Sequence, residues 1–395
     1  PEQVKPKTRR WVHENVLSGD IKNASAALRL VQGERPNTYL SFDFENTEAR
    51  FMRHMPHVQD GSGHASLVKE RFVLVIDDGF VTAPQGGDVL VAGTSFIVPD
   101  TRVKPDPPGV VRLRADGGLE AALSLLDRPP LEIMKIAGLP LDLASGQIEV
   151  DGTISLPLQK GVPLSAIEFD VLGSARDVRT DVLLKDRDLA SDRLAVQVSE
   201  SEVRITGDVT MDGIPASITW SQPIGKPETP RPGQLTGQLD ITPDALDTLG
   251  IALPRGLVRG AAEADFSVEL AKGSPPRLQL TSDLRGIRLS IPEVSWGKSE
   301  QTEASLNLSA TIGDQPNVDR IALSAPGLAA EGEVRLTENG QLDRLRMNRL
   351  RLGSWLNAPV DLVGRGAGRP VGVEVRGGRI DLRPSLIHIS EPTRR

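Results

Sequence analysis

The sequence contains no cysteine, so disulfide bonds, thiolate metal ligands and cysteine nucleophiles are excluded from this chain. Aromatic residues make up only 3% of the 395 residues, and there is a single tyrosine. Large rings usually contribute much of the buried area of a compact core. An apolar surface in this chain must therefore be built mainly from valine, leucine, isoleucine and alanine.

Long apolar runs are also missing: no stretch of about 18 apolar residues, the minimum for a membrane-spanning helix, occurs. The chain starts at Pro1 rather than at methionine, which indicates a fragment whose targeting or anchoring segment would lie upstream. The last ten residues, 386–395, resemble the translation of a sequencing adaptor, and we exclude them from the fold reasoning.

The overall composition is that of a globular protein, with 38% hydrophobic and 25% charged residues. The formal net charge is -7, from 53 acidic and 46 basic residues that are spread evenly along the chain. Such a distribution predicts no basic face for a nucleic-acid backbone. We therefore expect no nucleic-acid partner.

Strict alternation of apolar and polar residues is the dominant pattern. It is longest in three segments, residues 146–158, 262–270 and 304–312, where one face is aliphatic and the other polar or charged. Shorter copies occur near residues 167–171, 194–198, 203–205, 278–280, 287–291 and 371–375. This alternation predicts antiparallel sheet with one solvated face.

Turn residues and a few helical stretches interrupt the strands. Hairpin turns or bulges are predicted at residues 77–79, 116–118, 151–152, 212–213, 339–340 and 377–378. Short helices are predicted at 46–55, 118–126 and 131–137, and after the N-cap Thr242. A unit of strand, short helix, proline, glycine and long strand recurs at irregular spacing, which favours an elongated architecture of degenerate repeats.

Three histidines near Asp60 are the strongest candidate for a metal site: His54, His57 and His64. They straddle a predicted helix end and a glycine-rich loop rather than converging, so we interpret them as solvated or capping residues.

Catalytic motifs are equally weak. Gly297-Lys298-Ser299 resembles the end of a phosphate-binding loop, but Pro292 stands where that loop needs its first glycine. The neighbouring Asp77 and Asp78 lie on a predicted turn, where aspartate is favoured because it bonds to the backbone. The sequence has no Gly-x-Ser-x-Gly motif for a serine nucleophile. We therefore expect no catalytic site.

The aliphatic faces of the strands leave two interpretations open. In a closed sandwich such faces bury one another. In an open, folded-over sheet they would line a trough with room for an apolar guest. Each buried methylene of that guest would gain roughly 0.8 kcal/mol, so acyl chains could be held without any polar motif.

A series of short motifs occurs in a characteristic order, namely Trp11-Val12, Leu17-Ser-Gly-Asp-Ile21, Phe96-Ile-Val-Pro-Asp100, Leu139-Pro-Leu141, Ser145-Gly-Gln-Ile148, Leu328-Ala-Ala-Glu-Gly-Glu-Val334 and Gly378-Arg-Ile-Asp-Leu-Arg-Pro384. In this order the chain resembles the central region of YhdP-type, AsmA-like proteins over residues 11–384. The resemblance is carried by the order of the motifs and not by any single one.

The resemblance implies a periplasmic protein of Gram-negative bacteria, anchored in the inner membrane by an N-terminal helix upstream of this chain. It implies an elongated β-groove that moves phospholipids between the inner and outer membranes, a role related to that proposed for TamB. Bulk passage needs no residue-specific chemistry, so we expect no enzyme, no cofactor and no metal. The expected groove lining is Ile148, Val150, Ile154, Leu156, Phe266, Val268, Leu306 and Leu308.

We therefore expect a mainly β fold, an elongated and folded-over antiparallel sheet of degenerate repeats with a few short helices. The predicted divisions are a flexible start at 1–10, groove segments at 11–115, 116–235 and 236–385, and an artefactual tail at 386–395. The alternative is a non-transporting structural or interaction protein of the cell envelope, such as an outer-membrane assembly factor or a β-sandwich adhesin. A carbohydrate-processing enzyme is disfavoured, because neither paired carboxylates nor an aromatic platform is present.

Overall fold

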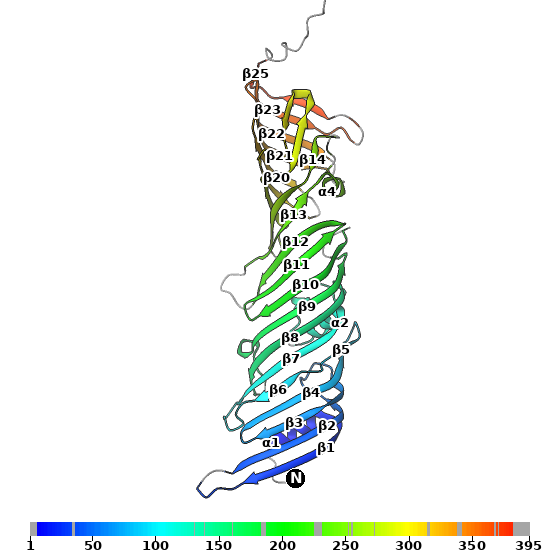
Figure 1. Cartoon of the computed structure of the whole chain (residues 1–395), viewed down its shortest axis with the longest axis vertical. Helices are drawn as coiled ribbons and strands as arrows, with labels where there is room; N and C mark the ends of the chain where they lie inside the picture. The colour runs from blue at the N-terminus through cyan, green and yellow to red at the C-terminus, as the bar shows by residue number, and fades with distance from the viewer. Residues whose placement is uncertain are drawn as a thin grey trace, which may run out of the picture. The chain divides into compact units, whose positions relative to one another are not determined.

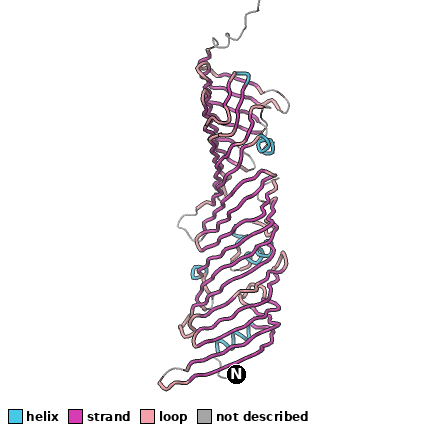
Figure 2. The backbone as a smooth tube through the Cα atoms, in the orientation of Figure 1, coloured by secondary structure: helices cyan, strands magenta, loops and turns pink. Residues whose placement is uncertain are grey.

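In the computed structural model, strands make up 62% of the chain and helices 8% (Figure 2). The structure describes residues 6–33, 36–129, 131–137, 139–159, 161–182, 187–224, 231–251, 253, 256–271, 273–313, 317–337, 342–366, 369 and 371–381. Within these residues, 22 strands belong to one antiparallel sheet and three short strands form a second sheet. The prediction of a mainly β, antiparallel fold with a few short helices is confirmed.

The chain divides into two compact units, one of residues 1–209 with 224–226 and one of residues 210–223 and 227–395. This division does not test the three predicted groove segments, because segments of one sheet need not be separate bodies. Residues 1–5 and 386–395 lie outside the described residues, while residues 6–10 belong to the first helix.

The first unit is a succession of antiparallel strands that pair with neighbours in the chain, and α2 and α3 connect β7 to β8 (Figure 1). Its strands are β1 (Val16–Arg29), β2 (Asn37–Ala49), β3 (Val58–Val68), β4 (Arg71–Thr82), β5 (Asp88–Leu90), β6 (Ser95–Val98), β7 (Pro108–Gly118), β8 (Ser145–Pro157), β9 (Glu168–Thr180), β10 (Leu189–Ser199) and most of β11 (Glu202–Met211). Strands β5 and β6 both pair with β4 and with β7, so the two short strands together occupy one strand position of the sheet. Its helices are α1 (Pro6–Asn15), α2 (Leu119–Leu126), α3 (Ile133–Ala137) and the 3-10 turn η1 (Leu164–Ala166).

The second unit continues the same pattern of neighbouring antiparallel strands. Its main-sheet strands are β12 (Ile214–Pro223), β13 (Gly233–Ile241), β15 (Ala262–Leu270), β16 (Arg277–Ser282), β19 (Ser305–Thr311), β20 (Asn317–Ala325), β21 (Leu328–Leu336), β22 (Leu342–Leu352), β23 (Leu356–Val363), β24 (Gly372–Val375) and β25 (Arg379–Ile380). Strands β24 and β25 both pair with β23.

A separate three-stranded sheet is inserted in the second unit. It consists of β14 (Val258–Gly260), β17 (Ile287–Ile291) and β18 (Trp296–Lys298), and it is accompanied by the helix α4 (Pro243–Thr248) and the 3-10 turn η2 (Pro292–Val294). Gly260 and Gly286, which both have positive φ, lie against each other where this sheet joins the main sheet. A Cβ on Gly260 would lie only 2.2 Å from the carbonyl oxygen of Gly286. Only glycine permits this close approach.

Several local predictions are confirmed. Strands β8, β15 and β19 occupy the three long alternating segments. Helices α2, α3 and α4 occur where helices were predicted, and the Thr242 side chain caps α4 by accepting a hydrogen bond from the Ala245 amide at 3.0 Å. Asp212 and Gly213 have φ of 49° and 84° and form the turn between β11 and β12. The turn predicted at 339–340 lies outside the described residues.

Three local predictions are wrong. Residues 116–118 form neither a turn nor a bulge: they end β7 and pair in regular register with residues 147–149 of β8. Residues 46–55 form no helix: β2 runs to Ala49 and pairs there with Val58 of β3, so sheet pairing prevails over the local helical pattern. Asp151-Gly152 is not a turn but the middle of β8, where Gly152 faces Val171 of β9. A Cβ on Gly152 would lie 2.7 Å from Val171 Cγ2, so the glycine makes room for a neighbouring side chain.

Candidate functional site

Aliphatic residues of neighbouring strands stand directly opposite one another in the first unit. Val150 of β8 lies between Ala115 of β7 and Gly173 of β9, and Gly173 in turn faces Val196 of β10. Side chains that are directly opposite in a sheet share one face. We call this aliphatic side the inner face and the charged side the outer face, in each unit.

The second unit carries two long inner-face rows, each with one residue from every main-sheet strand from β13 to β24. The first row consists of Gly237, Phe266, Leu280, Leu308, Ile321, Gly332, Met347, Val360 and Val375. The second consists of Leu235, Val268, Leu278, Ala310, Val318, Val334, Leu345, Leu362 and Val373. Neither row contains a polar or ionisable side chain.

All eight predicted lining residues lie on the inner face, four in β8 and four in β15 and β19. Seven of them are half-buried, and Val268 alone is buried, with 6% of its surface exposed. Central residues of a closed sandwich are normally covered by the opposite sheet. The half-buried state of the seven means that this face still has apolar area to bury.

Small elements cover part of the inner face in each unit. Helix α2 packs Ala121 against Ala83 and Val89, next to Ala115. In the second unit, Leu284, Ile287 and Leu289 of the three-stranded sheet region form one buried cluster with Ala262 of β15 and with Ala304, which immediately precedes β19. A second cluster joins Trp296 to the ends of β21, β22 and β23. In the second unit, these clusters therefore cover the inner face at the end where β15, β19, β21 and β23 begin.

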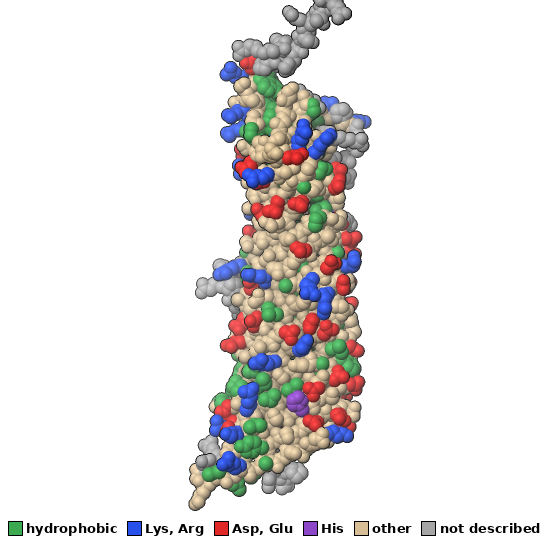
Figure 3. Space-filling model, in the orientation of Figure 1, with side chains coloured by type: hydrophobic (Ala, Val, Ile, Leu, Met, Phe, Trp, Pro, Cys, Tyr) green, Lys and Arg blue, Asp and Glu red, His purple; other side chains and the backbone are tan. Residues whose placement is uncertain are grey.

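Ion pairs connect neighbouring strands on the outer face. Glu149 of β8 lies 3.3 Å from Arg114 of β7 and 3.3 Å from Arg176 of β9, so one carboxylate bridges two strands. Figure 3 shows acidic and basic side chains interspersed over the side that it views. Exposed pairs of this kind contribute little stability each, and they keep this face solvated.

The histidines near Asp60 make separate local contacts. His57 Nε2 accepts a hydrogen bond from Arg50 Nε at 3.2 Å, which leaves Nδ1 to donate to Glu48 at 2.9 Å. His64 Nδ1 lies 3.1 Å from Asp77 on the next strand. No group of three or more potential ligands that could hold a metal ion occurs among the described residues.

Lys298, in the weak phosphate-loop motif, is buried within the small sheet. It is 3% exposed, and its Nζ donates to the backbone oxygens of Leu284 at 2.6 Å, Ile287 at 2.7 Å and Ser299 at 3.2 Å. Burial lowers the pKa of this ammonium group. The three carbonyl groups occupy its three donors, so it ties the small sheet together instead of facing a ligand.

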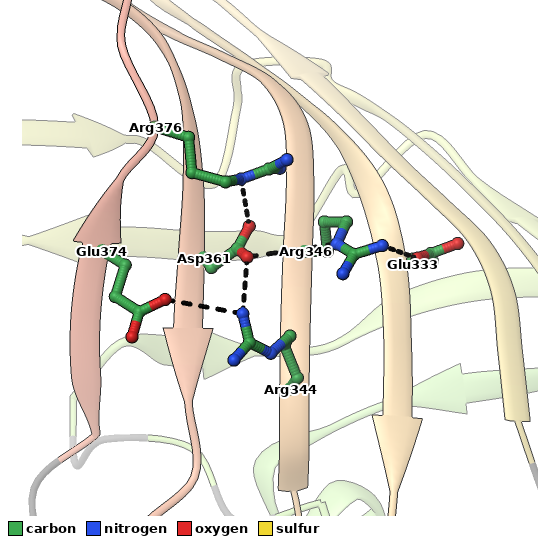
Figure 4. Close-up of polar contacts among 6 residues, drawn as sticks. All are labelled: Glu333, Arg344, Arg346, Asp361, Glu374 and Arg376. Atoms are coloured by element: carbon green, nitrogen blue, oxygen red, sulfur yellow. Dashed lines mark hydrogen bonds and ion pairs between the residues drawn. The ribbon is translucent and has the colours of Figure 1, made fainter.

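Sequence reasoning missed a buried carboxylate in β23. Asp361 is 1% exposed, and Arg344 Nη1 lies 2.8 Å and Arg376 Nε 2.9 Å from its oxygens (Figure 4). Arg346 Nε is 4.0 Å away. Asp361 gave no sequence signal beyond being the single charged residue of its strand, since its partners are 15 to 17 positions distant.

Two open depressions, of about 480 and 440 Å³, lie mostly among outer-face residues of the second unit. The first is lined by hydroxyl and amide groups and by Asp265, whose carboxylate accepts a hydrogen bond from Gln238 at 2.9 Å. The second lies between Arg320, Glu331, Glu333 and Arg349. In both depressions the charged groups contact side chains of neighbouring strands, Asp265 with Gln238 and Glu331 with Arg320, and they do not converge on a reacting centre.

No protein-family model, curated protein or solved structure matches this chain. None of the helices formed by the described residues combines the length and the apolar composition needed to cross a bilayer.

Proposed function

We propose that this chain is a segment of a periplasmic bridge that conducts phospholipids between the inner and outer membranes, with their acyl chains lying along the inner face. The family resemblance supplies the biological setting of this proposal, including the inner-membrane anchor. The inner face supplies its physical basis.

The observation that carries the proposal is the pair of inner-face rows from β13 to β24. Nine neighbouring strands of the main sheet present only apolar or glycine residues in each row, and most of these residues are half-buried. A guest acyl chain would bury the remaining apolar area at roughly 25 cal/mol per Å². Because the rows contain no charge, they favour no particular headgroup and no fixed position along the face.

A non-transporting envelope protein is the competing function, and one observation favours it. The clusters around Ile287 and Leu328 seal the inner face at one end, as the core of a purely structural domain would. The two functions differ in what happens at the half-buried residues away from these clusters, such as Leu280 and Leu308.

The test compares phospholipid carried by matched variants. We expect the purified chain to release phospholipid on solvent extraction and to show lipid adducts in native mass spectrometry. Leu280→Glu combined with Leu308→Glu places two carboxylates on the inner face and should abolish the adducts. The control combines Thr281→Glu with Asn307→Glu, which adds the same charges to the outer face of the same two strands and should retain them.

Circular dichroism must show that both variants keep their strand content. Phospholipid adducts lost only from the inner-face variant support the bridge. A wild-type chain without bound phospholipid, or equal lipid content in both variants, would contradict it and favour the structural alternative.

A further inference from the structure

The outer face of the last five strands of the second unit is rich in arginines. Strands β21 to β25 bring seven of them to this face, namely Arg335, Arg344, Arg346, Arg349, Arg351, Arg376 and Arg379. The sequence, with its evenly spread charges and net charge of -7, predicts no such basic face. Four of the seven lie within residues 344–351 of one strand, β22, and the register brings the other three beside them.

The carboxylates of this face are already engaged. Glu331 is 2.8 Å from Arg320, and Glu333 is 3.3 Å from Arg346. Asp361 is held by Arg344 and Arg376, and Glu374 lies 3.5 Å from Arg344 (Figure 4). Asp343, the other acidic residue of β22, falls in the bulge before Arg344. These pairs use arginines from the centre of the face.

Four arginines are left without an ion pair among the described residues: Arg335, Arg349, Arg351 and Arg379. All four are exposed. Arg351 and Arg379 stand in one cross-strand row on either side of Asn357, and Ala329 is the next residue in that row. This row has two guanidinium groups and no carboxylate. Arg349 adds a third guanidinium two residues along β22 from Arg351.

We propose that this arginine face binds a bilayer surface that carries anionic phospholipid headgroups. Adjacent strands lie about 4.8 Å apart and alternate residues of a strand about 7 Å apart, so Arg349, Arg351 and Arg379 form an array of guanidinium groups spread over this face. An array of this kind matches many phosphates spread over a surface better than one phosphate held in a pocket. Guanidinium groups suit phosphate because their planar donors can bind two oxygens at once.

This proposal does not depend on phospholipid transport. The arginines point away from the inner face, so a chain that binds no lipid there could still dock on a membrane, and the reverse also holds. The buried Asp361 lies beside the free arginines and pairs with two of their neighbours, Arg344 at 2.8 Å and Arg376 at 2.9 Å.

The experiment measures partitioning of the full chain onto sonicated vesicles by co-sedimentation at low and high salt. Vesicles of phosphatidylcholine with phosphatidylglycerol should bind the chain, and phosphatidylcholine alone should not. Each arginine near an anionic surface contributes about 1 kcal/mol, so Arg351→Gln with Arg379→Gln should weaken partitioning by about 25-fold. Arg351→Lys with Arg379→Lys keeps the charge and should retain most of the binding.

The matched control is Arg277→Gln with Arg288→Gln, which removes two exposed arginines of the same unit that lie outside this face, in β16 and β17. It should leave partitioning unchanged. Wild-type chain that ignores anionic vesicles at low salt, or a control as weak as the test variant, overturns the proposal. Binding that free phosphate abolishes at the same ionic strength, or tighter binding to a single-stranded oligonucleotide, overturns the choice of a bilayer as the partner.

Discussion

Gly237 of β13 and Phe266 of β15 face each other on the inner face, and the aromatic ring lies over the glycine. A Cβ on Gly237 would lie 2.8 Å from Cζ of Phe266 and 2.3 Å from the backbone oxygen of Ser217 in β12. Gly237 thus leaves room for one of the few aromatic rings of the chain within an aliphatic row.

Gly237→Ala should therefore destabilise the second unit. The new methyl group meets a backbone oxygen that cannot move without shifting β12, so we expect a loss of about 1–3 kcal/mol in the free energy of unfolding. Gly173→Ala in β9 is the control, because its Cβ would find its nearest atom, Val196 Cβ, at an ordinary 3.4 Å. Urea unfolding measures both, and equal stability of the two variants would contradict the close approach.

Replacing Lys298 tests whether it ties the small sheet together. Lys298→Met leaves the carbonyls of Leu284 and Ile287 without their ammonium donor, so we expect a loss of about 2–3 kcal/mol. Fluorescence of Trp296, in the same strand β18, should report early unfolding of this region. Arg288→Met, at an exposed position of β17, should change stability by less than about 0.5 kcal/mol. Equal effects of the two substitutions would refute the role given to Lys298.

The lowered pKa of Lys298 makes the stability of the chain depend on pH in a defined direction. Burial lowers its pKa in the folded chain below the ordinary 10.5, although Asp283 and Glu300 act in the opposite direction. Between the lowered pKa and 10.5 the unfolded chain binds more protons, so the lysine's contribution to stability rises with pH in this window and is constant below it. The stability of wild type relative to Lys298→Met should increase as the pH approaches 10.5, as followed by urea midpoints. A difference that falls toward pH 10.5 would contradict this sign.

Replacing the buried Asp361 should reduce stability more than replacing its exposed neighbour Glu374, which shares the partner Arg344. Asp361→Asn removes the buried negative charge that balances Arg344 and Arg376, and we expect a loss of about 2–3 kcal/mol, less than for a fully buried pair because both arginines are partly exposed. Glu374→Gln, at an exposed side chain, should cost less than about 1 kcal/mol. Thermal unfolding of the two variants gives the comparison, and a smaller effect at Asp361 would disprove its central place.

Regular alternation made the long strands predictable. In β8, β15 and β19 every second residue is apolar over nearly the whole strand, and a half-buried sheet imposes this same period. The same alternation placed the four predicted residues of β8, and the four of β15 and β19, on the inner face of their own unit. The capped helix α4 was equally readable, because Thr242 and Pro243 act locally.

Features that depend on distant partners could not be read from the sequence. Residues 287–291 alternate like any other strand, yet they belong to the small sheet, and only tertiary packing decides that choice. The helix expected at 46–55 fails because pairing with β3 holds these residues extended as far as Ala49. In the arginine face, four arginines lie close together in β22, but Arg335, Arg376 and Arg379 join them only through register, which sequence spacing does not reveal.

The central claim is that phospholipid acyl chains lie on the inner face, and photocrosslinking at neighbouring positions tests it most directly. Benzoylphenylalanine placed at Leu156 or Leu308, in cells or with added phospholipid vesicles, should form lipid adducts detectable by mass spectrometry. The same probe at Ser155 or Asn307, one residue away on the outer face, should form none. Adducts of equal yield at both members of each pair, or no adduct at Leu156 and Leu308, would contradict the account.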